Sequence, residues 1–261
     1  MRVWVDELPA VLDEVIRQLG VQVGEPFEPG GQCSWVAPVG SDRVLKVGFW
    51  HYEAAHEAAG LRLWDGAGAV RLHEARSFER TTALLLERCV PGTPLSQAMP
   101  GPEQDAVIAG LLRRLWQPAT EPFRPLHEMC DAWAAEFSSR PSDLDPGIAR
   151  AGLALLRSLP RDAVDEVLLC TDLHSENVLA AQRESWLVID PKPYVGDPAY
   201  DVVQHMLNTD RLHVDPLGLA RRLAGLLDLD ASRVELWLFA RCVQQSASWP
   251  ELAEVATRIA P

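Results

Sequence analysis

Two carboxylates and one carboxamide in the second half of the chain stand where short apolar runs begin or end. Asp172 lies just after one such run, Asn177 directly before the next, and Asp190 at the end of a third. If these runs are short strands, they deliver the three side chains to one edge. In phosphoryl transfer, one carboxylate orients the attacking hydroxyl and accepts its proton, while hard oxygen ligands hold magnesium against the phosphates. The three residues therefore predict a phosphoryl-transfer centre.

The spacing within this group supports that prediction. Asp172 and Asn177 are as far apart as the Asp and Asn of the kinase catalytic loop, H-R-D-x-x-x-x-N. Taken singly, Asp172 is also typical of a turn or a helix cap, and Asn177 of a turn. Their joint position between two apolar runs, with Asp190 ending the second of them, favours the catalytic interpretation.

A lysine in the first third of the chain is placed to meet nucleotide phosphates. Lys46 lies among apolar residues of a strand predicted at 43–49, and a helix predicted at 51–64 follows. A half-buried lysine needs a counter-charge, and Glu53 and Glu57 lie on one face of that helix. We expect Glu57 to be the partner, with Glu53 as the alternative, because a strand lysine paired with a helix glutamate positions the phosphates in kinases. The alternative for Lys46 is an edge lysine whose ammonium group reaches solvent.

A glycine-rich turn precedes this strand. The sequence at 29–34 is PGGQCS, between two predicted extended runs. Glycines let backbone N–H groups approach phosphate oxygens closely, so we predict that Gly30, Gly31 and Ser34 contact the nucleotide. The same pattern is also typical of an ordinary β-hairpin.

The surrounding elements predict an α+β protein. Residues 1–87 have the pattern of a small antiparallel sheet with one inserted helix, a boundary falls at 88–91, and residues 92–261 are mainly helical. The segment 74–80 is expected to be a connecting turn. Strands are predicted at 23–28, 35–39, 43–49, 69–73, 82–87, 167–170, 178–180 and 186–189, and helices at 6–19, 51–64, 104–117, 126–138, 147–158, 199–208, 216–227, 232–248 and 251–259.

The chain is acidic, with 24 Lys and Arg against 37 Asp and Glu and a formal net charge of −13. This charge and the lack of a basic stripe disfavour nucleic acid and an anionic membrane as partners. A cationic small-molecule substrate suits it, and the acids within 128–145 and 228–254 either line such a cleft or cover solvated helix faces. The 5 cysteines are scattered without a C-x-x-C pair, and no apolar run reaches the length of a membrane span. We therefore expect a cytoplasmic protein, and no obligate protein partner is evident.

A set of short motifs resembles the aminoglycoside/hydroxyurea phosphotransferase family, to which streptomycin 6-kinases belong. The similarity runs from about residue 25 to 210, and the block that begins at Asp190 and ends at Asp201 is its most specific part. The motifs are WVAPV at 35–39, VLK at 44–46, HEA at 56–58, LLLER at 84–88, PG at 91–92, VIDPK at 188–192 and GDPAYD at 196–201.

The resemblance implies a two-lobed, protein-kinase-like fold that uses ATP or GTP with Mg²⁺. By match to the family, Asp172 is expected to be the catalytic base, Asn177 and Asp190 the metal ligands, and Lys46 with Glu57 the pair that positions the phosphates. The hinge at 87–90, with Glu87 and Cys89, is expected to meet the adenine through its backbone.

The function implied is transfer of the γ-phosphoryl group to a hydroxyl of an aminoglycoside-type, streptomycin-like antibiotic. The main alternative is a kinase for a small metabolite such as an amino-alcohol, a sugar or a hydroxyurea-like compound. A nucleotide-binding regulatory protein with weak or no turnover, and a metal hydrolase that uses His174, are more distant alternatives.

One departure from the family pattern stands beside the predicted base. Relatives commonly carry His-Gly before the catalytic Asp, whereas this chain has Cys170 and Thr171. We interpret Cys170 as a buried strand-end residue rather than a nucleophile, and His174 as a residue that orients the loop. Asp197 and Asp201 are typical of a helix cap and a first-turn acid, and one of them is also a candidate to support the catalytic loop.

Overall fold

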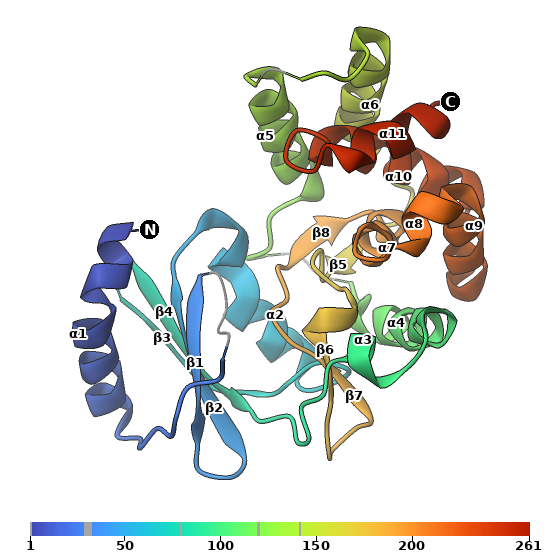
Figure 1. Cartoon of the computed structure of the whole chain (residues 1–261). Coiled ribbons are helices and arrows are strands. Elements are labelled where there is room, and N and C mark those ends of the chain that lie inside the picture. The colour runs from blue at the N-terminus through green and yellow to red at the C-terminus, as the bar shows by residue number, and fades with distance from the viewer. Residues whose placement is uncertain (1, 29–32, 79, 119–120, 141) are drawn as a thin grey trace.

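The strand that carries Lys46 lies inside a four-stranded antiparallel sheet with the order β1-β2-β4-β3. The computed structural model describes residues 2–28, 33–78, 80–118, 121–140 and 142–261. Figure 1 shows this sheet in the N-terminal lobe, with the mainly helical C-terminal lobe beside it. The strands are β1 (Ser34–Val39), β2 (Arg43–Phe49), β3 (Leu72–Ser77) and β4 (Thr81–Glu87).

The two faces of β2 have different partners. Leu45 and Val47 are buried against Val15 of helix α1 (Arg2–Leu19), which covers the outer face of the sheet. Because successive side chains of a strand point to opposite faces, Lys46 points the other way, toward the C-terminal lobe. The alternation of side chains along β2 therefore directs Lys46 into the space between the lobes.

The segment after β2 is a short 3₁₀ turn (Tyr52–His56) followed by helix α2 (Glu57–Trp64), rather than the continuous helix expected over 51–64. Leu61 and Trp64 of α2 are buried in the main core. Gly60 allows α2 to approach the C-terminal lobe, because a Cβ added there would lie 2.4 Å from Cγ of Pro193.

The C-terminal lobe combines helices with two small two-stranded sheets, β5–β8 and β6–β7. An apolar cluster runs from α2 and β4 into its helices, so the two lobes share buried core. A parallel bridge between Ala69 and Val188 adds a backbone link between the lobes. The elements are α3 (Leu95–Ala98), α4 (Gly101–Leu115), α5 (Leu126–Ser138), α6 (Pro146–Ser158), β5 (Val167–Leu169), β6 (Val178–Ala180), β7 (Trp186–Val188), β8 (Tyr194–Gly196), α7 (Pro198–Leu207), α8 (Arg211–Val214), α9 (Pro216–Leu227), α10 (Ala231–Gln245) and α11 (Glu251–Arg258).

Several predicted elements differ from the structure. Residues 74–77, expected in a turn, belong to β3, an edge strand whose exposed polar residues hid its pattern. The expected strand at 23–28 is not a regular strand: Val23 forms an isolated bridge with Val39, and the N–H groups of Gly24 and Phe27 donate to carbonyls of β1 at 2.9 Å. The strand β5 pairs with the unpredicted β8, and not with β6 and β7, so the three apolar runs do not form a single edge.

In the part of the chain that the structure describes, no helix combines the length and apolar character that crossing a membrane requires.

Candidate active site

Lys46, Glu57 and Asp190 meet in the space between the lobes. The ammonium group of Lys46 donates to the two oxygens of Glu57 at 2.7 and 2.8 Å, and to Oδ1 of Asp190 at 2.7 Å. Burial alone would lower the pKa of Lys46, but the two adjacent carboxylates raise it well above its ordinary value. The lysine is therefore held charged, and the expected pairing with Glu57 is present.

The β6–β7 hairpin sets Asn177 beside Asp190. Val178 lies opposite Val188 in the hairpin. Beside this pair, the backbone N–H of Ile189 donates to the carbonyl of Asn177 at 2.9 Å. The amide nitrogen of Asn177 donates to the backbone carbonyl of Asp172 at 3.0 Å. This bond leaves the amide oxygen of Asn177 as an acceptor, and the Asp190 side chain is 42% exposed. One amide oxygen and one accessible carboxylate fit Mg²⁺, which takes oxygen ligands and fills its remaining positions with water and phosphate.

Asp172 is held through both carboxylate oxygens. Its Oδ2 lies 2.9 Å from the ammonium nitrogen of Lys192. Its Oδ1 accepts a hydrogen bond from Nε2 of Gln204, on α7, at 3.0 Å. The side chain is 19% exposed, so it is partly shielded yet accessible from a neighbouring cavity.

The backbone before Asp172 is supported by Asp201. Its buried carboxylate accepts from the backbone N–H groups of Cys170 at 2.9 Å and Thr171 at 2.6 Å. Burial raises the pKa of Asp201 to about 6, and these donors limit the rise. Asp197 instead caps α7 by accepting from the N–H of Ala199 at 2.9 Å. The expected support of the loop is thus confirmed for Asp201, and the expected cap for Asp197.

The two residues that depart from the family pattern have defined environments. Cys170 is fully buried, and burial raises the pKa of its thiol well above the ordinary value, as expected for an inert strand-end residue. Thr171 has a φ of 53°, in the left-handed region that β-branched residues disfavour. Its hydroxyl donates to the backbone carbonyl of Lys192, a bond that a glycine at this position would lack.

The end of β4 is fixed by an ion pair across the lobes. Glu87 accepts two hydrogen bonds from Arg183, which lies between β6 and β7, at 2.8 and 2.9 Å. Burial would raise the pKa of Glu87, but Arg183 and the N–H of Arg71 lower it overall. Burial raises the pKa of the nearby Cys89 thiol to about 12. The backbone role of Glu87 and Cys89 at the adenine stays a prediction.

The glycine-rich turn is only partly described. Gly30 and Gly31 lie outside the described residues, so their predicted contact with phosphate stays a prediction. Ser34 begins β1 opposite Gly48 of β2, and the carbonyl of Cys33 accepts from the N–H of Phe49 at 2.9 Å.

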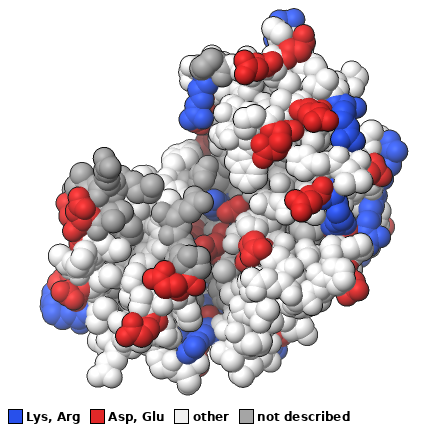
Figure 2. Space-filling view, in the orientation of Figure 1, with Lys and Arg blue, Asp and Glu red and all other residues white. Residues whose placement is uncertain are grey.

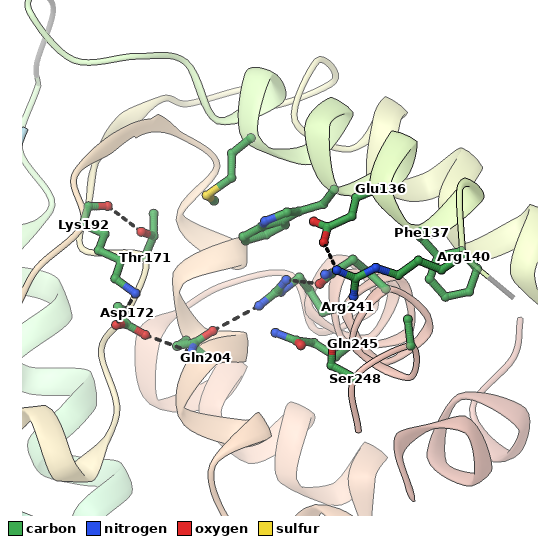
Figure 3. Close-up of a pocket in the computed structure, with 14 residues that line it drawn as sticks. Glu136, Phe137, Arg140, Thr171, Asp172, Lys192, Gln204, Arg241, Gln245 and Ser248 are labelled. Atoms are coloured by element: carbon green, nitrogen blue, oxygen red, sulfur yellow. Dashed lines mark hydrogen bonds and ion pairs between the residues drawn. The ribbon is translucent and has the colours of Figure 1, made fainter. Parts of the chain in front are cut away.

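A cavity of about 210 Å³ opens beside Asp172 (Figure 3). Trp133, Phe137 and other side chains of α5 form one wall, and residues of α7 and α10 form the others. Sequence reasoning missed Gln204 and Arg241, which link this cavity to Asp172. Both are helix residues with no local motif, and they meet only because α7 and α10 lie side by side.

The charged groups of this cavity are largely paired with one another. Lys192 lies against Asp172 at 2.9 Å, and Arg140 is ion-paired with Glu136. Figure 2 shows acidic side chains in the hollow between the lobes, with a basic one beside them. Of the acids within 128–145, Glu136 lines the cavity, whereas Asp131 pairs with Arg161 at 2.6 Å. Of the two readings left open for this segment, cleft lining therefore holds only for Glu136 at this cavity.

The two halves of the site suit a transfer reaction. Lys46 and Asp190 present a cation and an accessible carboxylate between the lobes, and Asp172 faces a cavity that can admit a small molecule with a hydroxyl. The contact of Asn177 with the backbone of Asp172 joins the two halves at 3.0 Å. A hydroxyl in the cavity and a phosphate beside Lys46 would meet near Asp172 and Asp190.

Comparison with known proteins gives the same fold and chemistry. Residues 19–253 match the family model of the aminoglycoside/hydroxyurea antibiotic resistance kinases. The chain is 35% identical to a streptomycin 6-kinase of Streptomyces griseus, over 100% of this chain and 88% of that protein. It is 36% identical to a hydroxyurea phosphotransferase of Kitasatospora aureofaciens, over 98% of this chain and 77% of that protein.

Among solved structures, the choline kinase LicA of Streptococcus pneumoniae in complex with AMP has the same fold. It superposes with a TM-score of 0.67 at 16% identity, over 96% of each chain. The family model and the two relatives cover most of this chain, and both relatives are named as kinases or phosphotransferases. The chain therefore belongs to the aminoglycoside/hydroxyurea antibiotic resistance kinase family, and it is a phosphotransferase with the two-lobed kinase-like fold.

Proposed function

We propose that the protein transfers the γ-phosphoryl group of ATP to a hydroxyl of a streptomycin-like aminoglycoside and thereby inactivates the antibiotic. The observation that carries the proposal is the placement of Asp172 at a cavity, beside the triad of Lys46, Glu57 and Asp190. The streptomycin 6-kinase of Streptomyces griseus, similar along the whole chain, supports the substrate class.

The nucleotide would lie between the lobes. Lys46 would contact its α- and β-phosphates, and Glu57 would hold the lysine in place at 2.7 Å. The backbone near Gly30, Gly31 and Ser34 would cover the phosphates, and the backbone of Glu87 and Cys89 would meet the adenine. The AMP complex of LicA supports an adenine nucleotide, with GTP as the alternative.

Asn177 and Asp190 would hold Mg²⁺, which neutralises charge on the phosphates during transfer. Asp172 would orient the acceptor hydroxyl and take its proton late, because little bond-making precedes cleavage in a loose transition state. Lys192 lies 2.9 Å from one carboxylate oxygen of Asp172 and so helps to hold the carboxylate in place. Positioning and electrostatics therefore supply most of the catalysis, and no covalent enzyme intermediate is needed.

A second candidate substrate is hydroxyurea or another small neutral hydroxyl compound. Two observations favour it: the charges that line the cavity are mostly paired, and the hydroxyurea phosphotransferase of Kitasatospora aureofaciens is 36% identical. A polycationic antibiotic would find few unpaired carboxylates in this cavity. We place either reaction in the cytoplasm, where ATP is available, and propose no obligate protein partner.

The test is a panel of acceptors. Purified protein is given ATP or GTP with Mg²⁺ and streptomycin, other aminoglycosides, hydroxyurea or simple amino-alcohols, and each product is identified by mass spectrometry. The Asp172→Ala variant is the negative control, and Asp162→Asn, an exposed residue before β5, is the matched control. Phosphorylation of an aminoglycoside that is lost only in Asp172→Ala supports the proposal. Phosphorylation of hydroxyurea alone supports the second candidate, and no phosphorylated product from any acceptor would contradict both.

A further inference from the structure

Three side chains form a hydrogen-bonded chain from the candidate base into the helical lobe (Figure 3). Gln204 of α7 donates from Nε2 to Oδ1 of Asp172 at 3.0 Å. Nη2 of Arg241, on α10, donates to Oε1 of Gln204 at 3.2 Å. Asp172 and Arg241 are thus connected through a single carboxamide.

The direction of both hydrogen bonds follows from chemistry alone. An ionised carboxylate only accepts, a guanidinium only donates, and a carboxamide has one end of each kind. Gln204 must therefore present its NH₂ group to Asp172 and its oxygen to Arg241. If the amide were reversed, two oxygens would face each other at Asp172 and two donors would face each other at Arg241. Arg241 thus selects the one orientation of Gln204 in which Asp172 receives a hydrogen bond.

Arg241 is itself held firmly. It is only 2% exposed, and its guanidinium lies 4.2 Å from the ring centroid of Trp133. It also donates to the side-chain oxygen of Gln244. Among the described residues, no Asp or Glu forms an ion pair with Arg241, and its Nε has no hydrogen-bond partner. A buried cation without a carboxylate partner costs stability, so stabilisation of the fold does not by itself account for Arg241. Its contact with Gln204 gives Arg241 a second role.

We propose that Gln204 is a positioning residue for Asp172 and that Arg241 sets the orientation of Gln204. Lys192 holds the other carboxylate oxygen at 2.9 Å, so the two neighbours together fix the rotation of the carboxylate. As a neutral donor, Gln204 does so without neutralising the negative charge. The inference rests on the proposed role of Asp172 as the base. In addition, the orientation of the Asp172 carboxylate depends on Gln204 of α7 and Arg241 of α10.

Two substitutions at Gln204 separate positioning from folding. Gln204→Met removes the hydrogen bond at similar size. Gln204→Glu can form an ion pair with Arg241, which favours folding, but it places a second carboxylate against Asp172. We expect kcat to fall about 10- to 100-fold in both variants, since small misplacement of a reacting group has effects of this size. The affinity for ATP is expected to stay within about twofold of wild type, and the melting temperature of Gln204→Glu to stay at or above that of Gln204→Met.

A matched control and a double variant complete the test. Gln104, on α4, is also a half-buried glutamine, and its side chain donates to the carbonyl of Met99 at 2.8 Å. Gln104→Met is expected to leave kcat unchanged. Arg241→Met is expected to lower kcat in the wild-type background, and to add little in the Gln204→Met background, because both act through one hydrogen bond. A Gln204→Met enzyme with the wild-type kcat, or fully additive losses in the double variant, would overturn the proposal.

Crystal structures of the wild type and Gln204→Met keep the inference separate from the proposed function. We expect one orientation of the Asp172 carboxylate in the wild type and a rotated or split one in the variant, whatever the acceptor. An unchanged Asp172 in the variant would contradict the positioning role. If instead the wild type phosphorylates no acceptor while Asp172 rotates in the variant, the proposed function fails and the positioning role stands.

Discussion

Thr171 stores backbone strain immediately before the proposed base. A threonine with a φ of 53° is unfavourable by about 1–3 kcal/mol, because its branched side chain crowds the backbone in the left-handed region. Two contacts hold it there: its N–H donates to Asp201 at 2.6 Å, and its hydroxyl donates to the carbonyl of Lys192. A glycine at this position would adopt the same φ without strain. In this chain, hydrogen bonding takes the place of glycine's conformational freedom.

Two substitutions of Thr171 are expected to change the stability of the protein to different extents. Thr171→Val keeps the branched shape and the strain but leaves the Lys192 carbonyl without its donor, so we expect unfolding to become easier by about 1–3 kcal/mol. Thr171→Ser keeps the hydroxyl and is expected to lie within about 1 kcal/mol of wild type. Urea unfolding of both variants makes the measurement. A valine variant as stable as the serine variant would show that the hydroxyl contributes nothing.

At the scale of elements, the β6–β7 turn connects the two lobes. Arg183 of that turn makes a bidentate pair with Glu87, at the end of β4, at 2.8 and 2.9 Å. It also donates to the carbonyls of Gly66 at 2.7 Å and Ala69 at 3.0 Å, in the segment between α2 and β3. One side chain therefore fixes the end of β4 and the loop after α2 to the hairpin that carries Asn177.

Removing this side chain should loosen the arrangement of the lobes. We expect Arg183→Met to lower the free energy of unfolding by about 1–3 kcal/mol, since Glu87 is left half-buried without its partner. ATP affinity should also fall, because β4 leads into the proposed hinge. Thermal unfolding and calorimetric titration with ATP measure the two effects. Arg183→Lys is the control variant, since it retains the positive charge but cannot make the bidentate contact with Glu87. Unchanged ATP affinity in Arg183→Met would contradict a link between this pair and the nucleotide.

Local pattern was enough to predict the elements that carry the site. The apolar neighbours of Lys46 predicted a half-buried lysine that needs a counter-charge, and the following segment offered Glu53 and the preferred Glu57. The structure pairs Lys46 with Glu57. The strand β8 was missed because it is short, follows two prolines and pairs with the distant β5. The Gln204–Arg241 contact was also missed, because the two residues are 37 positions apart in the sequence and meet only where α7 packs against α10. The division of the chain at 88–91 stays a prediction.

At the scale of the whole molecule, the net charge of −13 says little about the site. Many acids pair with arginines outside the cavity, and the most buried of them, Asp105, links four helices. Asp105 of α4 contacts His205 at 3.1 Å, Arg211 at 2.5 Å and Arg222 at 2.8 Å, on α7, α8 and α9. Burial would raise the pKa of Asp105, but the hydrogen bonds from these three residues lower it below its usual range.

This network predicts acid sensitivity of the helical lobe. A carboxyl group with a lowered pKa in the folded state contributes stability above its unfolded pKa, near 4, and loses that contribution as pH falls through the folded pKa. The wild type should therefore lose stability between about pH 4 and pH 2. Asp105→Asn should be less stable at pH 7 by about 3 kcal/mol and should lose less on acidification. Urea unfolding of both proteins at pH 7 and pH 3 measures the difference, and equal losses in the two would contradict this role.

In the proposed reaction, Asp172 acts on an acceptor hydroxyl while Lys46 and Asp190 bind the nucleotide and its metal ion. Its most direct test is the single-turnover rate of phosphoryl transfer from ATP to the best acceptor, measured for wild type and Asp172→Asn together with their ATP affinities. We expect the transfer rate of Asp172→Asn to fall by about 10²–10⁴-fold, at nearly unchanged ATP affinity. Transfer by Asp172→Asn at the wild-type rate would contradict it.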